Sequence, residues 1–413
     1  MKLELIATAT FGLEAVVRRE VEALGYKILE TTDGRVAFQG DERAIAKSNL
    51  WLRAADRVYV KMGEFTAKTF EELFQQTKAI EWEKIIPLDG KFPVVGTSVK
   101  SELHSVPACQ SIVNKAVASR LCDFYVQDRM PETGAEYRIR FAALKDKFVM
   151  MIDASGVGLH KRGYRKADVA APIKETLGAA LVLLSYYRQD KPLADLTCGS
   201  GTIPIEAAMI ARNIAPGLGR DFASSNWEIV PKEIWKSERK LAYESADMSA
   251  ELNIKAYDID RKAIAASQQN ADAAGVSDDI NFFRLDMTKF MPASDFESPI
   301  TPDSEIANPN VSESQKSVDS KSSGISRDDY AVVISNLPYG ERIGDTESNQ
   351  KIYAKIKSLM AECPRWSFYL ITSDKELEKQ IGRRADRRRK LYNGNIETQL
   401  YQYHGLKPNK KSE

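Results

Sequence analysis

The chain has 413 residues, of which 59 are lysine or arginine, 58 are aspartate or glutamate, and 43% are hydrophobic. At about 150 residues per domain, this length predicts two or three domains, and the apolar fraction is high enough for complete cores. The net charge of +1 identifies no partner, so any nucleic-acid surface must come from local clusters of cations.

Cysteine and histidine are scarce. None of the four cysteines forms a C-x-x-C pair and only three histidines are present, so we expect no metal site. Scattered single cysteines are typical of a reducing cytosol. The amino end, MKLELIATATFGLEAVVRRE, lacks the apolar run of a secretory signal. No apolar run reaches the roughly 18 residues of a membrane span. We therefore expect a cytoplasmic protein without membrane helices.

Strands and helices are mixed in the first 155 residues. Asp33-Gly34 between two alternating runs predicts a hairpin, and Pro107 suits the first turn of a long helix. We predict strands at 2–9, 27–40 (the hairpin), 56–65, 91–101 and, as a pair, 136–155, with helices at 12–26, 41–50, 69–80 and 107–125. This α+β material is expected to form two small subdomains.

From about Pro172, strands and helices alternate. We predict a helix at 173–188, a strand, glycine loop and helix at 192–213, a strand and helix at 253–275, strands at 280–287 and 330–339, a helix at 351–363, a strand at 366–374, and a hairpin at 390–405 about Asn393-Gly394. The alternation predicts an α/β fold with a parallel doubly wound sheet, to which the hairpin adds antiparallel strands. Residues 297–329 hold nine serines and no aromatic residue, so we expect a flexible insertion there.

A glycine loop, DLTCGSGT, follows the first strand of this sheet. Gly199 and Gly201 let the backbone approach a ligand, and the amino end of the next helix offers unpaired N–H groups. Asp195, at the strand tip, is placed to accept hydrogen bonds from an amine. A nicotinamide-binding loop would have a third glycine where Pro204 stands. The glycines alone fit an ordinary tight turn equally well.

Two further acids end the next two strands. Asp258, in AYDID, is placed to hold ribose hydroxyls, and Asp286, in RLDM, to meet an adenine amine. The carboxyl ends of parallel strands line the crevice where such sheets bind ligands. Any one acid is commonly a helix cap, but the three together favour S-adenosyl-L-methionine as the cofactor.

The fourth strand ends at Asn336-Leu337-Pro338-Tyr339. An exocyclic amine on a base is a poor nucleophile, because its lone pair is delocalised into the ring. The Asn336 side-chain oxygen and a carbonyl of Leu337 or Pro338 are placed to accept its hydrogen bonds. Pro338 stiffens the turn, and Tyr339 offers a face for stacking a base. We interpret this stretch as the catalytic segment of methyl transfer, against the alternative of a plain strand-end turn.

This constellation resembles class I S-adenosylmethionine-dependent methyltransferases of the Asn-Pro-Pro-Tyr type, with Leu337 in place of the first proline. Nearly the whole chain is similar to the bacterial THUMP-domain RNA methyltransferases. That group is similar to the amino-terminal half of the 23S rRNA guanine-N2 methyltransferase, and many of its members are labelled N6-adenine-specific DNA methylases. The similar segments are FGLEAVVRREVEALG, LWLRAADRVYV, SELHSVPACQSIVNKAV, DASGVGLHKRGYR, APIKETLGAAL, DLTCGSGTIPIEAAMIARNIAPGL and LYNGNIETQLYQY.

The resemblance implies four regions: a ferredoxin-like subdomain at 1–56, a THUMP RNA-binding domain at 57–157, a linker and helix at 158–190, and a Rossmann-like methyltransferase domain with a seven-stranded sheet at 191–406. It implies that the cofactor residues are Asp195, Thr197, Gly199, Gly201, Asp258, Ile259, Asp286, Met287 and Asn336. It implies that the catalytic residues are Asn336, Pro338 and Tyr339.

Cations gather in HKRGYRK, between the two halves of the chain. Lys161, Arg162 and Arg165 are placed to contact phosphates, and Tyr164 to stack on a base. A solvated linker is the plain alternative, which the resemblance disfavours. Arg342, just past the catalytic segment, is placed to meet a phosphate beside the target base. A second basic run, RRADRRRK, fits a phosphate-facing loop or a solvated turn equally well.

We expect methylation of guanine N2 in 23S rRNA, with RNA as the partner. Adenine N6 of RNA or DNA is an open alternative, because the same motif serves either amine. Glutamine side chains of proteins are a third acceptor of this kind, which the RNA-binding front half disfavours. An alternative of another class is a non-catalytic RNA-binding assembly factor. A nicotinamide oxidoreductase is disfavoured by Pro204 and by the lack of a histidine suited to hydride transfer.

Overall fold

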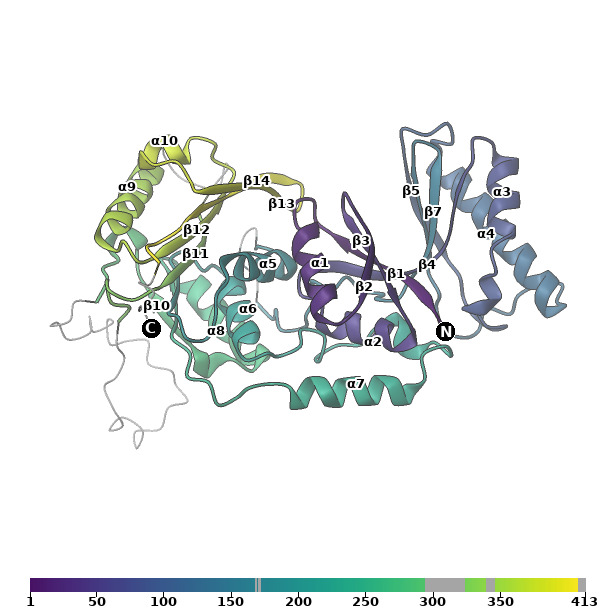
Figure 1. Ribbon diagram of the computed structural model, residues 1–413, viewed down its shortest axis with the longest axis horizontal. Coiled ribbons are helices and arrows are strands. Elements are labelled where there is room, and N and C mark those ends of the chain that lie inside the picture. Colours follow the sequence, from purple (N-terminus) through teal and green to yellow (C-terminus); the bar gives the residue numbers. More distant parts are fainter. Residues whose placement is uncertain (168, 170–171, 294–323, 339–345, 408–413) are drawn as a thin grey trace, which may run out of the picture. The chain divides into compact units, whose positions relative to one another are not determined.

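The structure, a computed structural model, describes residues 1–167, 169, 172–293, 324–338 and 346–407, with only the backbone at 346–348. The chain forms two compact units (Figure 1). The first unit comprises Met1–Arg162 and Ile214–Ala246, and the second comprises Gly163–Asn213 and Asp247–Glu413. No helix in the described part of the chain is long and apolar enough to cross a membrane.

The first unit is built on a seven-stranded sheet with the order β2-β3-β1-β4-β7-β6-β5, in which only β5 and β6 are parallel neighbours. The strands are β1 (Leu3–Ala9), β2 (Lys27–Thr32), β3 (Arg35–Gly40), β4 (Ala55–Thr66), β5 (Val94–Val99), β6 (Ile139–Leu144) and β7 (Lys147–Asp153). The helices of its first 162 residues are α1 (Glu14–Ala23), α2 (Glu42–Trp51), α3 (Phe70–Lys78) and α4 (Val106–Tyr125). Every strand and helix predicted for this region is confirmed.

Strand β4 connects the two subdomains that the sequence predicts. Residues Ala55–Val60 of β4 pair with β1, and residues Tyr59–Thr66 pair with β7. A strand of 12 residues is long enough to pair with β1 along its first part and with β7 along its second. The two predicted subdomains therefore share one continuous sheet.

Residues 214–246 pack in the first unit, although by sequence they lie within the region expected to be the methyltransferase domain. Helix α7 (Lys232–Glu244) contacts α2. Trp227 stacks on Tyr137 with ring centroids 5.0 Å apart, and its Nε1–H donates to the carbonyl of Glu136 at 2.9 Å. The segment therefore completes the core of the first unit.

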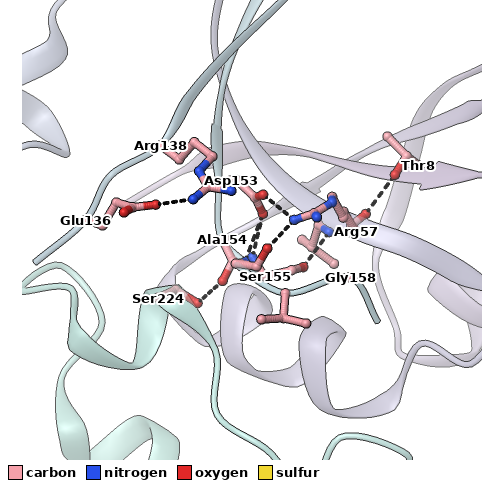
Figure 2. A network of polar contacts seen from close by, with 12 residues as sticks. Thr8, Arg57, Glu136, Arg138, Asp153, Ala154, Ser155, Gly158 and Ser224 are labelled. Atoms are coloured by element: carbon pink, nitrogen blue, oxygen red, sulfur yellow. Dashed lines mark hydrogen bonds and ion pairs between the residues drawn. The ribbon is translucent and has the colours of Figure 1, made fainter. Parts of the chain in front are cut away.

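A polar network closes the end of β7 in the same unit (Figure 2). Asp153 is buried; its Oδ1 accepts the N–H groups of Ser155 and Gly156 at 3.0 and 3.1 Å, and its Oδ2 accepts from Arg57 at 2.5 Å. Burial raises the pKa of Asp153, and the Arg57 guanidinium opposes that rise. Ser224, from the 214–246 segment, donates to the carbonyl of the adjacent Ala154 at 2.7 Å.

The second unit carries a seven-stranded sheet with the order β10-β9-β8-β11-β12-β14-β13 (Figure 1). The strands from β10 to β12 are parallel, and β14 is antiparallel to both of its neighbours. They are β8 (Leu193–Asp195), β9 (Ile254–Asp258), β10 (Ile280–Arg284), β11 (Val332–Asn336), β12 (Ser367–Thr372), β13 (Arg387–Asn393) and β14 (Ile396–Tyr403). The helices are α5 (Glu175–Ser185), α6 (Thr202–Ala211), α8 (Arg261–Ala274), α9 (Thr346–Glu362) and α10 (Leu377–Ile381). The predicted α/β class, with an antiparallel hairpin added to a parallel sheet, is confirmed.

Three local predictions differ from the structure. Helix α5 ends at Ser185 rather than near 188, because Tyr186 adopts a left-handed conformation with φ of 55°. The last hairpin turns at Gly394-Asn395, one residue later than expected, because Asn393 pairs with Ile396. Strand β13 begins at Arg387, so half of the basic run RRADRRRK is strand rather than loop.

The expected serine-rich insertion falls mostly on residues 294–323, which lie outside the described part of the chain. Its last residues are described and packed. Ile325 is buried in the core of the second unit, and the Ala293 N–H donates to its carbonyl at 2.9 Å. A single aliphatic residue among serines left no periodic pattern from which this packing could be predicted.

Candidate active site

The carboxyl ends of β8, β9 and β11 lie together at one edge of the second unit's sheet. Asp195 ends β8 and Asp258 ends β9. The Gly199 N–H donates to Asp258 Oδ2 at 2.9 Å, and the Thr197 hydroxyl donates to the Asn336 carbonyl at 3.0 Å. The glycine loop is therefore joined to the ends of both neighbouring strands, so these five predicted site residues lie in one rim.

The glycine loop needs glycine at two places. Gly199 and Gly201 have φ of 56° and 80°, in the left-handed region that other residues rarely adopt. A Cβ on Gly201 would lie 2.8 Å from Ser267 Cβ on α8, too close for any side chain. The Cys198 N–H donates to the Tyr257 carbonyl at 2.8 Å, which fixes the loop to β9. The loop thus aims the amino end of α6 toward the rim.

Asp195 is fully buried and only partly satisfied. Its Oδ1 accepts the Thr197 N–H at 3.2 Å, whereas its Oδ2 is buried without a hydrogen-bond partner among the described residues. Burial raises the pKa of Asp195 to about 7, and the Thr197 N–H and the polar Ser335 side chain nearby oppose that rise. A buried acceptor without a hydrogen-bond donor destabilises the protein. A ligand amine or ammonium that donates to Oδ2 would therefore stabilise the carboxylate.

The other two acids are already engaged with the backbone. Asp258 Oδ1 accepts the Asp260 N–H at 2.9 Å, in addition to the Gly199 contact at Oδ2. Asp286 Oδ1 accepts from the N–H and hydroxyl of Thr288 at 2.9 and 2.8 Å. Each carboxylate oxygen has a second lone pair, so both acids can still accept a ligand hydroxyl or amine. The contacts orient the two carboxylates in advance.

The neighbours of these acids differ in exposure. Ile259, after Asp258, leaves 63% of its surface exposed, which offers an apolar face at the rim. Met287, after Asp286, is buried and packed in the hydrophobic core of the second unit. Only the backbone of Met287 is therefore suited to contact a ligand.

Asn336 presents a second unsatisfied acceptor. Its Oδ1 is buried and has no partner in the described part of the chain. Leu337, which stands where relatives of the Asn-Pro-Pro-Tyr type have proline, is buried and donates its N–H to the Ile371 carbonyl of β12 at 3.0 Å. A proline could not make that bond, so Leu337 anchors the turn. Pro338 follows half-buried; Tyr339 lies outside the described residues.

Two of the four expected RNA-binding residues of HKRGYRK, Lys161 and Arg162, belong to the first unit. Lys161 is exposed. Arg162 is buried and donates to the carbonyls of Leu159 and Arg53. An arginine held by two backbone carbonyls in the interior serves the packing of its own unit, and this placement argues against an RNA contact. Arg342, the remaining expected phosphate contact, lies outside the described residues.

The other two lie inside the second unit. The Tyr164 hydroxyl donates to buried Glu206 at 3.1 Å. Arg165 donates to Glu175 at 2.8 Å, to Ser200 Oγ at 2.8 Å and to Thr202 Oγ1 at 3.0 Å. Arg165 thus stabilises the glycine loop through its hydrogen bonds to Ser200 and Thr202. The side chains of Tyr164 and Arg165 both bind protein groups and are not presented to a nucleic acid.

Sequence reasoning missed two residues that support the rim. Ser335 Oγ accepts the Leu196 N–H at 2.9 Å, which joins β11 to the glycine loop. Asn270, on α8, accepts the N–H of Lys166 at 2.7 Å and donates to the Ser200 carbonyl at 3.0 Å. Neither residue stands in a motif, and only their positions in the folded chain show their role.

Three family models match the chain. The RlmL ferredoxin-like domain matches residues 4–59, the THUMP domain residues 67–153, and the RMKL-like methyltransferase domain residues 162–302 and 304–402. The last match covers more than half of the sequence. The chain belongs to the RMKL-like methyltransferase family.

Individual relatives agree with this RMKL-like assignment. The "Putative RNA methyltransferase YpsC" of Bacillus subtilis (strain 168) is 44% identical over 404 residues, which cover 97% of this chain and 96% of that protein. The "Ribosomal RNA large subunit methyltransferase K/L" of Syntrophotalea carbinolica (strain DSM 2380 / NBRC 103641 / GraBd1) is 30% identical over 416 residues, 97% of this chain but 53% of that protein. The chain therefore spans about half the length of the K/L relative.

A solved relative also shows a ligand. The crystal structure of SMU.472, described as "a putative methyltransferase complexed with SAH", superposes with a TM-score of 0.85 at 39% identity and covers 99% of both chains. S-adenosylmethionine is the cofactor of this RMKL-like methyltransferase, and the rim residues fit it. Asp195 Oδ2 lacks a donor that the cofactor's ammonium can supply, and Gly201 leaves backbone where a side chain would not fit. Among the described residues, no cluster of three or more acidic, histidine or cysteine side chains could hold a metal ion.

Proposed function

We propose that this chain methylates an exocyclic amine of a base in RNA, and that the target is guanine N2 of 23S rRNA. The observation that carries the proposal is Asn336 Oδ1, a buried acceptor with no partner among the described residues, at the rim where the methyl donor binds. The THUMP match and the names of the YpsC and K/L relatives support RNA as the substrate.

The chemistry requires little more than positioning. S-adenosylmethionine supplies a methyl group on a positively charged sulfur. Asn336 Oδ1, with a carbonyl of Leu337 or Pro338, accepts the N–H groups of the amine and directs the nitrogen lone pair at that carbon. The N–C bond forms as the S–C bond breaks, and the nitrogen releases a proton that no strong base has to remove. The rate gain then comes from orientation and preorganised acceptors.

Three further residues would serve the RNA. Lys161 is exposed and free to approach a phosphate group from the solvent side. Tyr339 would stack on the target base, and Arg342 would meet the backbone beside it, although both lie outside the described residues. Arg162, Tyr164 and Arg165 have no part in this proposal, because their side chains are held by protein partners.

The test uses ribosomal RNA from a strain that lacks the gene, incubated with the protein and S-adenosylmethionine and then digested to nucleosides for mass spectrometry. We expect methylguanosine to appear. Asn336→Ala should lower kcat by about 100-fold or more, the usual effect of removing one such polar contact from a transition state. Its affinity for the cofactor should change much less. Asn281→Ala, at an exposed asparagine of β10, serves as the control and should keep full activity.

Other outcomes distinguish the alternatives. Methyladenosine in place of methylguanosine would assign adenine N6 as the target. Cofactor binding by calorimetry without any methylated nucleoside would contradict the rRNA substrate. Neither binding nor methylation would favour a non-catalytic assembly factor. Full turnover by Asn336→Ala would refute the role of its amide.

A further inference from the structure

The outermost strand of the second unit's sheet and the four residues before it form a strongly basic surface. We call residues 383–390 the basic edge; they include six cations and one acid. All six side chains except that of Arg389, which is half-buried, are exposed. Strand β13 has a neighbour on one side only, β14 (Figure 1), so no other described strand of the second unit pairs with its outer side.

The acids nearby do not neutralise this surface. Arg383 pairs with Asp386 at 3.6 Å, Arg388 with Glu378 at 3.3 Å, and Lys390 with Glu397 at 2.7 Å. Ion pairs at a protein surface contribute little to stability, and three acids cannot balance six cations. The side chains of Arg384 and Arg387 make no hydrogen bond or ion pair with any other described residue. The basic edge therefore presents an excess of positive charge to solvent.

The register of the sheet relates this surface to the catalytic rim. Asn336 pairs with Ile371, Ile371 with Leu400, and Leu400 with Arg389. The four residues occupy one row across the sheet, and at about 4.8 Å per strand Arg389 lies roughly 14 Å from Asn336. Arg387 lies two residues below that row. The cations thus run along the sheet border up to the level of the candidate catalytic residue.

The hairpin continues past the rim. Strand β12 ends at Thr372, opposite Gln399, whereas β13 and β14 go on pairing through Tyr392↔Glu397 and Asn393↔Ile396. Three further pairs at about 3.3 Å per residue carry the hairpin roughly 10 Å beyond the end of β12. The basic edge therefore continues into the projecting end of the β13–β14 hairpin, which lies beside the proposed entry of a substrate base.

We propose that the basic edge binds the sugar–phosphate backbone of the RNA whose base enters the active site. This inference rests on the proposed function and adds the surface that holds the strand next to the target nucleotide. Phosphates are complementary in charge, and cations at this spacing from the rim suit contacts to nucleotides that flank the target. Cations on an edge strand also keep two sheet edges from pairing. Arg384 precedes the strand, however, and could not serve that purpose.

The test is the salt dependence of RNA binding by the full chain. Arg384→Gln/Arg387→Gln is compared with the wild type by filter binding to ribosomal RNA from the deletion strain. The control, Arg188→Gln/Lys191→Gln, removes two cations just before the inner strand β8, where the parallel strands of the same sheet begin and so away from the rim at their carboxyl ends. We expect the slope of log Kd against log salt to fall by about 1.4, at about 0.7 per lost phosphate contact on a single strand. We also expect KM for RNA to rise by about ten-fold with kcat nearly unchanged.

Three results would overturn the inference. The slope and KM could stay at wild-type values, or the control pair could lower them equally. Alternatively, the variant could self-associate on gel filtration with RNA binding intact, which would show that the cations only keep sheet edges apart. Unchanged S-adenosylmethionine affinity in both double variants verifies that they are folded. If the wild type methylates no nucleoside but the slope falls as expected, the proposed function fails while the RNA surface stands.

Discussion

Asp195 Oδ2 and Asn336 Oδ1 are buried acceptors that the described part of the protein leaves without donors. Each such atom costs about 1–3 kcal/mol, because water no longer solvates it and no protein group replaces water. The ligands proposed here would supply a donor to each, an ammonium at Asp195 and a base amine at Asn336. The unpaired acceptors thus destabilise the ligand-free protein, and binding of both ligands removes that destabilisation.

Asp195 predicts a pH dependence of cofactor binding. In the cofactor-free protein its pKa is raised to about 7 by burial, so the folded state holds the proton more tightly than the unfolded chain does. Its contribution to the free energy of unfolding therefore declines as pH rises from about 4 to about 7. A carboxylate that accepts from the cofactor's ammonium must be ionised. We expect the affinity for S-adenosylmethionine to rise about ten-fold per pH unit below that pKa and then to level off.

Calorimetric titrations between about pH 5.5 and 8.5 would measure this, with proton release followed in buffers of different ionisation enthalpy. Asp195→Asn should bind the cofactor more weakly at pH 8 and lose the dependence. The variant should also be more stable than the wild type at that pH when no cofactor is present. An unchanged pH profile in Asp195→Asn would show that another group controls binding.

At the scale of elements, the glycine loop sets the direction of α6. A matched pair of glycine substitutions separates the effect of the loop's close packing from that of backbone strain. Gly201 and Gly275 both adopt left-handed backbone, with φ of 80° and 71°. An added Cβ at Gly201 would lie 2.8 Å from Ser267 Cβ, whereas at Gly275 it would meet nothing within 4 Å. Gly275→Ala should therefore cost only the backbone strain of about 1–2 kcal/mol.

Gly201→Ala should cost that strain and a further 1–3 kcal/mol or so of overpacking against α8, and it should weaken cofactor binding. Denaturant unfolding gives the first quantity and calorimetry the second. Equal losses of cofactor affinity in both variants would mean that backbone strain alone, and not the close approach of the loop to α8, decides the shape of the site.

At the scale of the whole molecule, residues 214–246 belong to the first unit, although the sequence on both sides of them belongs to the second. Trp227 is 2% exposed and stacks on Tyr137. Trp227→Ala should destabilise the first unit by about 3–5 kcal/mol, whereas Trp227→Phe, which keeps a ring, should cost less. Thermal unfolding with and without S-adenosylmethionine would separate the units, because the rim proposed for the cofactor lies in the second unit and the cofactor should raise that unit's transition alone. A first transition that does not move in Trp227→Ala would contradict this packing.

Much of the architecture could be predicted because its signals are local. Alternating and helical spacing placed every strand and α-helix of the first 155 residues, and strand–helix alternation indicated the parallel sheet. The rim residues Asp195, Asp258 and Asn336 could be predicted as neighbours for a similar reason, since parallel strands end at one edge of their sheet. The sequence by itself therefore determined the fold class, the family and the gathering of these residues at one rim.

Only the tertiary structure decided what depends on contacts between distant segments. It decided that β4 serves two subdomains, that residues 214–246 pack with the first unit, and that Arg162 and Arg165 are held inside while the basic edge stays exposed. A basic tetrapeptide looks the same in sequence whether its cations meet solvent or backbone carbonyls. Burial is set by partners that lie from about ten to more than a hundred positions away, such as Glu175 for Arg165 and Arg53 for Arg162.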